Sequence, residues 1–550
     1  MSERSETTSP VILGLGGSGH EWSTCAVRGE ELVAVAEERV TRKKYGLGAD
    51  LLAAESRRAC LEAFSASAKD VEKIVVCDLV PRPFYFPFRQ LAEKINHHLA
   101  HAHCAFATSG VERAAILVVD NSGSVLEGDK TGAVREVETA SIFDAGPDGI
   151  KLLMRITGEH HLQAATETEF YQAGQTSNSL GYFFRSASLA LGFSFQNPKG
   201  PGIFSEDGKT MGLSPYGDDR YIDQVGELID LSAKGGLKCD HRAIDVFMEG
   251  SFKRGRFDER AALAYAVQHH LERAMVHLAR HAYDLTGHDC LCVAGGVALN
   301  SVANGKLVSD TPFHHIYVPS APSDDGIGLG CAAYGIWQKT GKRPVFPRSA
   351  YLGPPHAKGE TERAVAASGL EAIRPNDMIE AVAEELCKGK VVAWYQGRSE
   401  FGPRALGNRS ILAMPTPGWV RDKLNHEMKR REWFRPYAPI VPEERKDEYF
   451  EFANDSPHMS FVAPVRKPGD LPAATHVDGT ARLQTIRRTE NPMIHALLET
   501  VGRKSGTPIL LNTSFNCAGD PIVETPMDAI ESAKKMSLDY LVLGDHILTL

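Results

Sequence analysis

The first 36 residues contain three short apolar runs that are separated by tight, glycine-containing turns. Residues 11–15 end at the turn GGSG (16–19), and the apolar runs 23–27 and 32–36 are joined by the turn RGE (28–30). This pattern predicts an antiparallel three-stranded meander. A helical stretch at 51–64, a strand at 73–76, a helix rich in histidine and a buried strand at 114–119 follow. Such an order of elements restricts the chain to an α/β fold.

Three meander strands followed by helix and strand are the pattern of a ribonuclease-H-like half-domain. Actin-like ATPases and sugar kinases pair two such halves around a nucleotide. We expect the second half to start after the middle of the N-terminal region, with a long helix at 261–285 and a strand and turn at 290–299. Gly295 and Gly296 lie at that turn, where glycine lets the backbone approach a ligand closely. Packing alone explains such a glycine pair more readily.

At 550 residues the chain exceeds a single domain of ~100–200 residues. The stretch 341–355 is rich in proline, glycine and basic residues, which is typical of a linker. We therefore predict two domains, 1–343 and 344–550, and the second is expected to be another α/β unit. Hydrophobic residues make up 43% and charged residues 24% of the chain, which indicates a globular protein.

Charge and hydropathy limit the classes of partner that the chain is expected to bind. The net charge of −9 disfavours binding to nucleic acid. No apolar run approaches the ~18 residues of a membrane helix, and the first ten residues lack the apolar core of a signal peptide. The ten cysteines show no spacing typical of disulfides or zinc sites. We expect a cytoplasmic protein that binds neither nucleic acid nor a membrane.

The sequence HHLAHAH (97–103) is the sharpest local motif. His97 and His101 are four residues apart, so on a helix they share one face and can bind one metal ion. A histidine-rich surface helix is the alternative. Asp120 follows a buried strand, and the acids of a later loop, Asp324 and Asp325, offer a further carboxylate. Two imidazoles with one or two carboxylates favour Fe(II) or Mn(II) over a thiolate-seeking metal.

Two other segments carry candidate ligands for phosphate. Arginines and glycines interleave in 396–410, which includes Arg404, and basic residues interleave with aromatic residues in 429–436, which includes Arg435. Guanidinium groups are natural partners of phosphate, so a nucleotide site is favoured over a solvated basic surface. Ser514 and Asn516 follow the apolar residues 508–510. They suit either a site at the end of a strand or the N-cap of a helix.

Together these segments resemble the antibiotic and nodulation-factor O-carbamoyltransferases, in order along nearly the whole chain. FGPRALGNRS (401–410) and HVDGTAR (476–482) are the most specific blocks. The other matching blocks are EERVTRKKYG (37–46), the histidine cluster, GKTMGL (208–213), and residues 294–300, 431–439 and 511–516.

The resemblance implies an actin-like N-terminal domain, built from duplicated ribonuclease-H-like halves, and a YrdC-like C-terminal domain. The C-terminal domain would make carbamoyl adenylate from carbamoyl phosphate and ATP, with Mg(II) accompanying ATP. The N-terminal domain would pass the carbamoyl group to a hydroxyl of a small natural product. A threonylcarbamoyl-type tRNA modification enzyme is the main alternative, and an actin-like kinase is another. The oligomeric state is open, with a homodimer as one option.

The resemblance also implies roles for individual residues. The iron ligands of the family, which Mn(II) or Zn(II) could replace, fall on His97, His101, Asp120 and Asp324; the last is preferred to Asp325 because the first acid of the loop is the family's ligand. Adenylate contacts fall on Arg404, Arg435, Met459, Ser514 and Asn516. Lys43, Lys209, Gly295, Gly296 and Asn300 match segments near the nucleotide of the transferase domain. Catalytic roles fall on His20 as a general base, Lys43, Arg404 and Arg435.

Two loops depart from the family pattern. DNSGS (120–124) keeps the aspartate but lacks the glutamate that usually ends this motif, and the loop GGSGHEW (16–22) is also unusual. Both loops are expected to face the acceptor, so the resemblance leaves the acceptor unidentified.

Overall fold

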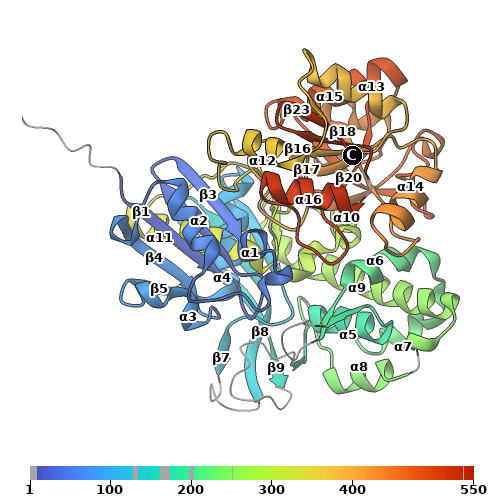
Figure 1. The fold of residues 1–550 in the computed structure, drawn as a ribbon. Helices are drawn as coiled ribbons and strands as arrows, with labels where there is room; N and C mark the ends of the chain where they lie inside the picture. Colours follow the sequence, from blue (N-terminus) through green and yellow to red (C-terminus); the bar gives the residue numbers. More distant parts are fainter. Residues whose placement is uncertain (1–8, 128–133, 162–173, 197–202, 251, 537) are drawn as a thin grey trace, which may run out of the picture.

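The structure is a computed structural model that describes residues 9–127, 134–161, 174–196, 203–250, 252–536 and 538–550. Its first sheet has the strand order β3-β2-β1-β4-β5 (Figure 1). The first three strands form the predicted antiparallel meander, and β4 and β5 continue the sheet in parallel with β1. The strands are β1 (Val11–Gly16), β2 (Ser23–Arg28), β3 (Glu31–Ala36), β4 (Val71–Cys77) and β5 (Ala92–Ile95).

The second sheet repeats this arrangement. Its order is β10-β9-β8-β6-β13-β14, with β7 beside β8. The strand β6 is antiparallel to β8 and parallel to β13, as β1 is to β2 and β4. The strands are β6 (Ala114–Val119), β7 (Val125–Glu127), β8 (Val134–Gly146), β9 (Gly149–His161), β10 (Gln175–Thr176), β13 (Cys290–Ala294) and β14 (His315–Tyr317). The N-terminal region therefore has two halves of like topology, as an actin-like fold requires.

One expectation about this region was wrong. The second half begins at β6, well before the middle of the N-terminal region, and β6 does not belong to the first sheet. The reason is its pairing, because β6 bonds to β8 and to β13, which lies more than a hundred residues later in the sequence.

Two helices pack between the sheets. The helix α11 (Ile327–Thr340) contacts β1 and β4 of the first sheet, and α4 (His97–Ser109) contacts α11 as well as β6 and β13. Glycines allow this packing, because a Cβ atom on Gly330 would lie only 1.9 Å from the carbonyl oxygen of Ala100. The outer helices α5 (Leu180–Ala190) and α9 (Phe257–Thr286) cover the second sheet. The first turn of α4 is thus held inside the molecule.

The C-terminal region is a third, mixed sheet of nine strands in the order β15-β23-β22-β16-β17-β21-β18-β20-β19. Helices α13 (Met378–Cys387) and α15 (Pro492–Ser505) cover one face, and α16 (Pro526–Met536) lies on the other. The strands are β15 (Ala372–Ile373), β16 (Val392–Tyr395), β17 (Arg409–Ala413), β18 (Ala438–Pro442), β19 (Phe461–Pro464), β20 (Thr480–Ile486), β21 (Leu510–Ser514), β22 (Tyr540–Leu543) and β23 (His546–Thr549). The expected second α/β unit is present.

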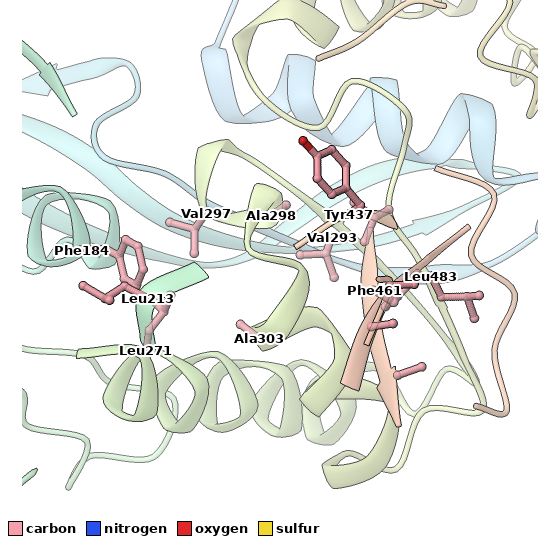
Figure 2. Packing of buried hydrophobic residues seen from close by; sticks show 14 of the residues in the cluster. Phe184, Leu213, Leu271, Val293, Val297, Ala298, Ala303, Tyr437, Phe461 and Leu483 are labelled. Atoms are coloured by element: carbon pink, nitrogen blue, oxygen red, sulfur yellow. The ribbon is translucent and has the colours of Figure 1, made fainter. Parts of the chain in front are cut away.

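The two regions share one hydrophobic core. Figure 2 shows Leu271 and Ala303 of the N-terminal region in the same cluster as Phe461 and Leu483 of the C-terminal sheet. Helix α10 (Ser301–Asp310) lies against β19. Asn304 of this helix donates a hydrogen bond of 2.9 Å to the backbone carbonyl of Ser460, the residue before β19. The domain boundary at 343/344 stays a prediction.

The remaining elements are short and connect these layers. No helix in the described part of the chain combines the length and the apolar character that crossing a bilayer needs. The elements are α1 (Glu37–Thr41), α2 (Glu55–Ala63), α3 (Arg82–Tyr85), α6 (Asp207–Leu213), α7 (Ile222–Gly226), α8 (His241–Met248), α12 (Glu360–Ser368), α14 (Trp419–Lys423) and the hairpin of β11 (Ser194–Gln196) and β12 (Ile203–Ser205).

Candidate active site

The four predicted metal ligands meet inside the N-terminal region. His97 and His101 lie on the first turns of α4, Asp120 follows β6, and Asp324 begins the turn before α11. Each Nε2 atom of the two histidines lies 3.3 Å from Asp120 Oδ2 and 3.5 Å from Asp324 Oδ1. All four side chains are buried, and their candidate ligand atoms lie within 4.8 Å of one another.

Local contacts fix this arrangement. The side chain of Asn96 accepts a hydrogen bond from the backbone of Leu99 and so caps the start of α4. The backbone nitrogen of His97 donates to Ser124 Oγ at 2.8 Å, and His97 Nδ1 lies 3.5 Å from the thiol of Cys77. The ring of His97 is therefore oriented with Nε2 toward the two carboxylates.

The electrostatics of the cluster favour a bound cation. Burial opposes the charged form of each group, yet the carboxylates raise the pKa of His97 well above its usual value. The imidazoles in turn lower the pKa of Asp120 well below the usual value, against the effect of burial. Neither ring nitrogen of His101 forms a well-aligned hydrogen bond with a described residue. A buried imidazole without such bonds is costly unless a ligand takes the position. The donor set therefore fits a divalent metal ion with nitrogen and oxygen ligands.

The other two histidines of the motif, His98 and His103, point away from the cluster. His98 Nδ1 lies 2.8 Å from Ser141 Oγ, and burial lowers the pKa of His98 to about 4. His103 packs edge-on against Tyr334 and Trp337, and burial lowers its pKa to about 3. Both are neutral residues of the interior.

A cavity of about 840 Å³ connects the metal-ligand cluster with the C-terminal region. The N-terminal region contributes His20, Asp120 and Asp324 to the wall, together with the turn 296–300. The C-terminal region contributes Arg404 and residues 429–432 and 435, and the loop 516–520 after Ser514 completes the wall. Residues from distant parts of the sequence thus line one cavity.

The C-terminal wall is strongly basic. Burial and then the charge of Arg435 lower the pKa of Arg404 to about 10, and burial likewise lowers the pKa of Arg431 to about 10. The pKa of Lys429 falls well below its usual value, first through burial and then through the neighbouring arginines. Several buried or partly buried cations that repel one another suit a polyanion such as a phosphate chain.

The sequence interpretation had not assigned three members of this basic cluster, which are Lys429, Arg431 and Arg482. Lys429 Nζ donates to the backbone carbonyls of Ser514 and Asn516, each at 2.8 Å, so it ties the two halves of the wall together. Burial and the charges of Arg404 and Arg435 lower the pKa of Arg482 well below its usual value. The signal that could have found them is their place in the blocks 429–436 and 476–482.

Comparison with known proteins decides the family. Two family models match the chain, Carbamoyltransferase N-terminus over residues 86–333 and Carbamoyltransferase C-terminus over residues 383–549. The nodulation protein NolNO of Sinorhizobium fredii is 34% identical to it over 96% of this chain and 79% of that protein. The chain belongs to the carbamoyltransferase family. It is therefore an enzyme of the carbamoyltransferase type, and the resemblance found from the sequence is confirmed.

Other relatives agree with this assignment and do not favour the tRNA-modifying alternative. The 3'-hydroxymethylcephem-O-carbamoyltransferase of Streptomyces clavuligerus is 34% identical over 46% of this chain and 48% of that protein. Among solved structures, full-length HypF in its phosphate- and nucleotide-bound form is similar with a TM-score of 0.42 and 14% identity, over 60% of this chain and 56% of that one.

Most predicted site residues of this carbamoyltransferase lie on the cavity wall. His20, Gly296, Ser514 and Asn516 line it, and so do Lys209 and Asn300. Lys209 Nζ lies 2.7 Å from carboxylate oxygens of both Glu206 and Glu432, so it links the two regions. Asn300 caps α10 through its side chain, which accepts a hydrogen bond from the backbone of Ala303.

Besides His97 and His101, three predicted residues are not among the residues that line the cavity of this carbamoyltransferase. Lys43 Nζ donates to the carbonyl of Gly48 at 2.6 Å, and its neighbour Lys44 lines the cavity instead. Gly295 is required for packing, because its φ is +91° and a Cβ atom there would lie 2.3 Å from the carbonyl oxygen of Val119. Met459 is 3% exposed and packs in a small apolar cluster that includes Leu406.

Proposed function

We propose that this carbamoyltransferase uses ATP and carbamoyl phosphate to carbamoylate a hydroxyl group of a small molecule, with one cavity serving both half-reactions. The observation that carries the proposal is the cavity wall. Basic residues of the C-terminal region and the two aspartates of the histidine–aspartate cluster in the N-terminal region line the same cavity. The cephem O-carbamoyltransferase among the relatives supports a hydroxyl as the acceptor group.

The first half-reaction is assigned to the basic wall. Carbamoyl phosphate, ATP and one water give carbamoyl adenylate, phosphate and pyrophosphate. In this scheme water releases carbamate from carbamoyl phosphate, and a carbamate oxygen then displaces pyrophosphate from the α-phosphorus of ATP. Arg404 and Arg435 would hold the α-phosphate and the carbamoyl phosphate group, and Mg(II) would accompany the triphosphate. Ser514 and Asn516 line the same cavity, where they suit contacts with the adenylate.

The second half-reaction is assigned to the N-terminal side of the cavity. The acceptor oxygen attacks the carbamoyl carbon, AMP leaves, and the hydroxyl proton passes to the imidazole of His20. Glu21 Oε2 lies 3.7 Å from His20 Nδ1 and accepts a hydrogen bond from Ser323, so a carboxylate is placed beside an imidazolium. When bound by His97, His101 and the two aspartates, a divalent ion such as Fe(II) would polarise a carbonyl or phosphoryl oxygen.

Protection of the intermediate from water matters for this chemistry. Carbamoyl adenylate is a mixed anhydride that water hydrolyses, so a path between the half-sites must keep water away. A small hydroxylated acceptor fits a space of this size better than a nucleic acid does. A cytoplasmic location agrees with the use of ATP, and a homodimer remains an open proposal.

The test separates the half-reactions. Pyrophosphate release from ATP and carbamoyl phosphate is measured without an acceptor. Arg404→Ala and Arg435→Ala should each reduce it by about tenfold to a hundredfold, the range expected when one charged hydrogen bond is lost. Arg445→Ala is the matched control, because Arg445 is paired with Glu448 on the surface of the same region. Release at the wild-type rate by both test variants would remove the adenylation role from this wall.

A further inference from the structure

One arginine of the N-terminal region reaches deep into the C-terminal region. Arg39 lies on α1, directly after the meander, and only 2% of its surface is exposed. Its Nη2 atom donates a hydrogen bond of 2.9 Å to the backbone carbonyl oxygen of Gly402. Gly402 lies two residues before Arg404, which lines the cavity.

The loop that Arg39 holds is pressed against the loop that carries a metal ligand. Gly402 has φ of +121°, and a Cβ atom there would lie 2.2 Å from the carbonyl oxygen of Ser320. Phe401 is 2% exposed and packs in one cluster with Ala321. The chain continues from Ser320 to Asp324 on one side of this contact and from Gly402 to Arg404 on the other. The contact therefore lies between the two half-sites.

The electrostatic setting keeps the guanidinium of Arg39 in place. Burial alone would raise the pKa of Glu38, but the charges of Lys44 and Arg39 lower it, so a carboxylate sits beside this buried cation. The Nη1 atom of Arg39 has no hydrogen-bond partner among the described residues. The bond from Nη2 to Gly402 is thus the hydrogen bond by which Arg39 holds the loop, beside the packing of Phe401 and Gly402.

We propose that Arg39 is a positioning residue that holds the loop 401–404 closed against the loop 320–324, so that carbamoyl adenylate is retained until it is transferred. This inference rests on the proposed function. If the bond to Gly402 is lost, the loop opens more often and water reaches the intermediate. Adenylation continues, while the intermediate is hydrolysed to carbamate and AMP instead of being kept.

The same helix region supplies a matched control. Arg42 also reaches into the C-terminal region, where its Nη2 donates to the carbonyl of Pro521 at 2.8 Å, and it pairs with Asp528. These contacts lie away from the loop 401–404 in the sequence and do not involve the loop 320–324. Arg42→Met therefore removes a comparable contact between the regions but leaves the contact between the half-sites.

The experiment uses ATP, Mg(II) and carbamoyl phosphate without an acceptor, in the full-length protein. The amplitude of the pyrophosphate burst gives the number of active sites. The later steady release of AMP per active site measures the leak, which is the rate at which carbamoyl adenylate is lost to hydrolysis. We expect a burst of wild-type amplitude in Arg39→Met with about tenfold faster AMP release, a smaller increase in Arg39→Lys, and a wild-type leak in Arg42→Met. Normalising to the burst removes any unfolded fraction.

Three outcomes oppose the inference. A wild-type burst with an unchanged leak in both Arg39 variants would overturn it and leave the proposed function standing. Loss of the burst in both Arg39 variants, with a normal Arg42→Met, would also overturn it, because Arg39 would then act in adenylation. A wild-type protein with no burst would remove the proposed function and this inference together.

Discussion

The conformation of the loop that carries Arg404 depends on one buried carboxylate. Glu400 is 1% exposed, and its Oε1 atom accepts hydrogen bonds from the backbone nitrogens of Leu406, Asn408 and Arg409 at 2.7, 2.8 and 3.1 Å. One oxygen therefore gathers three amides of the loop 401–410 and closes it into a ring. The perturbation that tests this role is Glu400→Gln, which keeps the shape of the side chain and removes its charge.

The expected loss of local stability in Glu400→Gln follows from the three hydrogen bonds to Oε1. A hydrogen bond to a charged group contributes about 1.5–3 kcal/mol and a neutral one about 1 kcal/mol. Since three bonds to one atom are not additive, Glu400→Gln should lower the local stability of the loop by about 2–4 kcal/mol. At about 1.4 kcal/mol per decade, the opening of the loop becomes about 30- to 700-fold more frequent.

The assay is amide hydrogen exchange measured on peptides that cover residues 401–413, because local opening is reported there without unfolding the whole chain. Glu524→Gln is the matched control. Glu524 is also buried, but the hydrogen bond to its Oε1 comes from one side chain, the hydroxyl of Ser399 at 2.8 Å. We expect faster exchange and a raised KM for ATP in Glu400→Gln only. Exchange that is equal in both variants would refute the reasoning, since the carboxylate would then not organise the loop.

Two further predictions concern the transferase side of the cavity. His97→Asn and His101→Asn should each lose bound metal in elemental analysis while pyrophosphate release without acceptor persists, because the metal ligands and the basic wall are separate groups of residues; full metal content in both variants would contradict the assignment of the ligands. His20→Asn should keep the metal and adenylation but slow single-turnover transfer by about 10²- to 10⁴-fold, since a positioned base contributes about that much. An unchanged transfer rate would show that His20 is not the base.

The sequence predicted local elements well and long-range pairing less well. The meander is visible because three apolar runs and two tight turns allow one arrangement. The strand β6 was recognised as a strand but was assigned to the wrong half, because a fully buried strand has the same apolar pattern in any sheet. Its partners β8 and β13 are set by the packing of α4 and α9, which the local sequence does not reveal.

The metal-ligand cluster was predictable because helix geometry fixes where His97 and His101 point. The choice between the two acids of the later loop needed the resemblance, and the structure agrees with the choice of Asp324, whose Oδ1 lies 3.5 Å from both imidazoles. The neighbouring Asp325 faces other carboxylates, and burial followed by the charge of Glu21 raises its pKa well above the usual value.

The placement of Lys43 could not be read from the sequence because of the backbone around it. Arg42 and Tyr45 both have positive φ, at 57° and 56°, and residues other than glycine rarely adopt this conformation. The backbone bends at these two residues, and Lys44 instead of Lys43 lines the cavity. Met459 has a φ of 54° as well, and it packs in an apolar cluster and is not among the residues that line the cavity. Local strain of this kind follows from tertiary packing and leaves no pattern in the sequence.

The position of the basic wall explains why the two regions are packed so closely. Buried cations such as Arg404 and Lys429 repel one another, and a folded chain tolerates them only if surrounding contacts hold them in place. Part of that support comes from the N-terminal region, because Lys209 pairs with Glu432 inside the basic segment and Arg39 holds the carbonyl of Gly402. An anionic ligand would relieve the repulsion, and so its binding should tighten the contact between the regions. Under the proposed function, adenylate formation and closure of the cavity would then be coupled through the same residues, which is the arrangement that a hydrolysable intermediate requires.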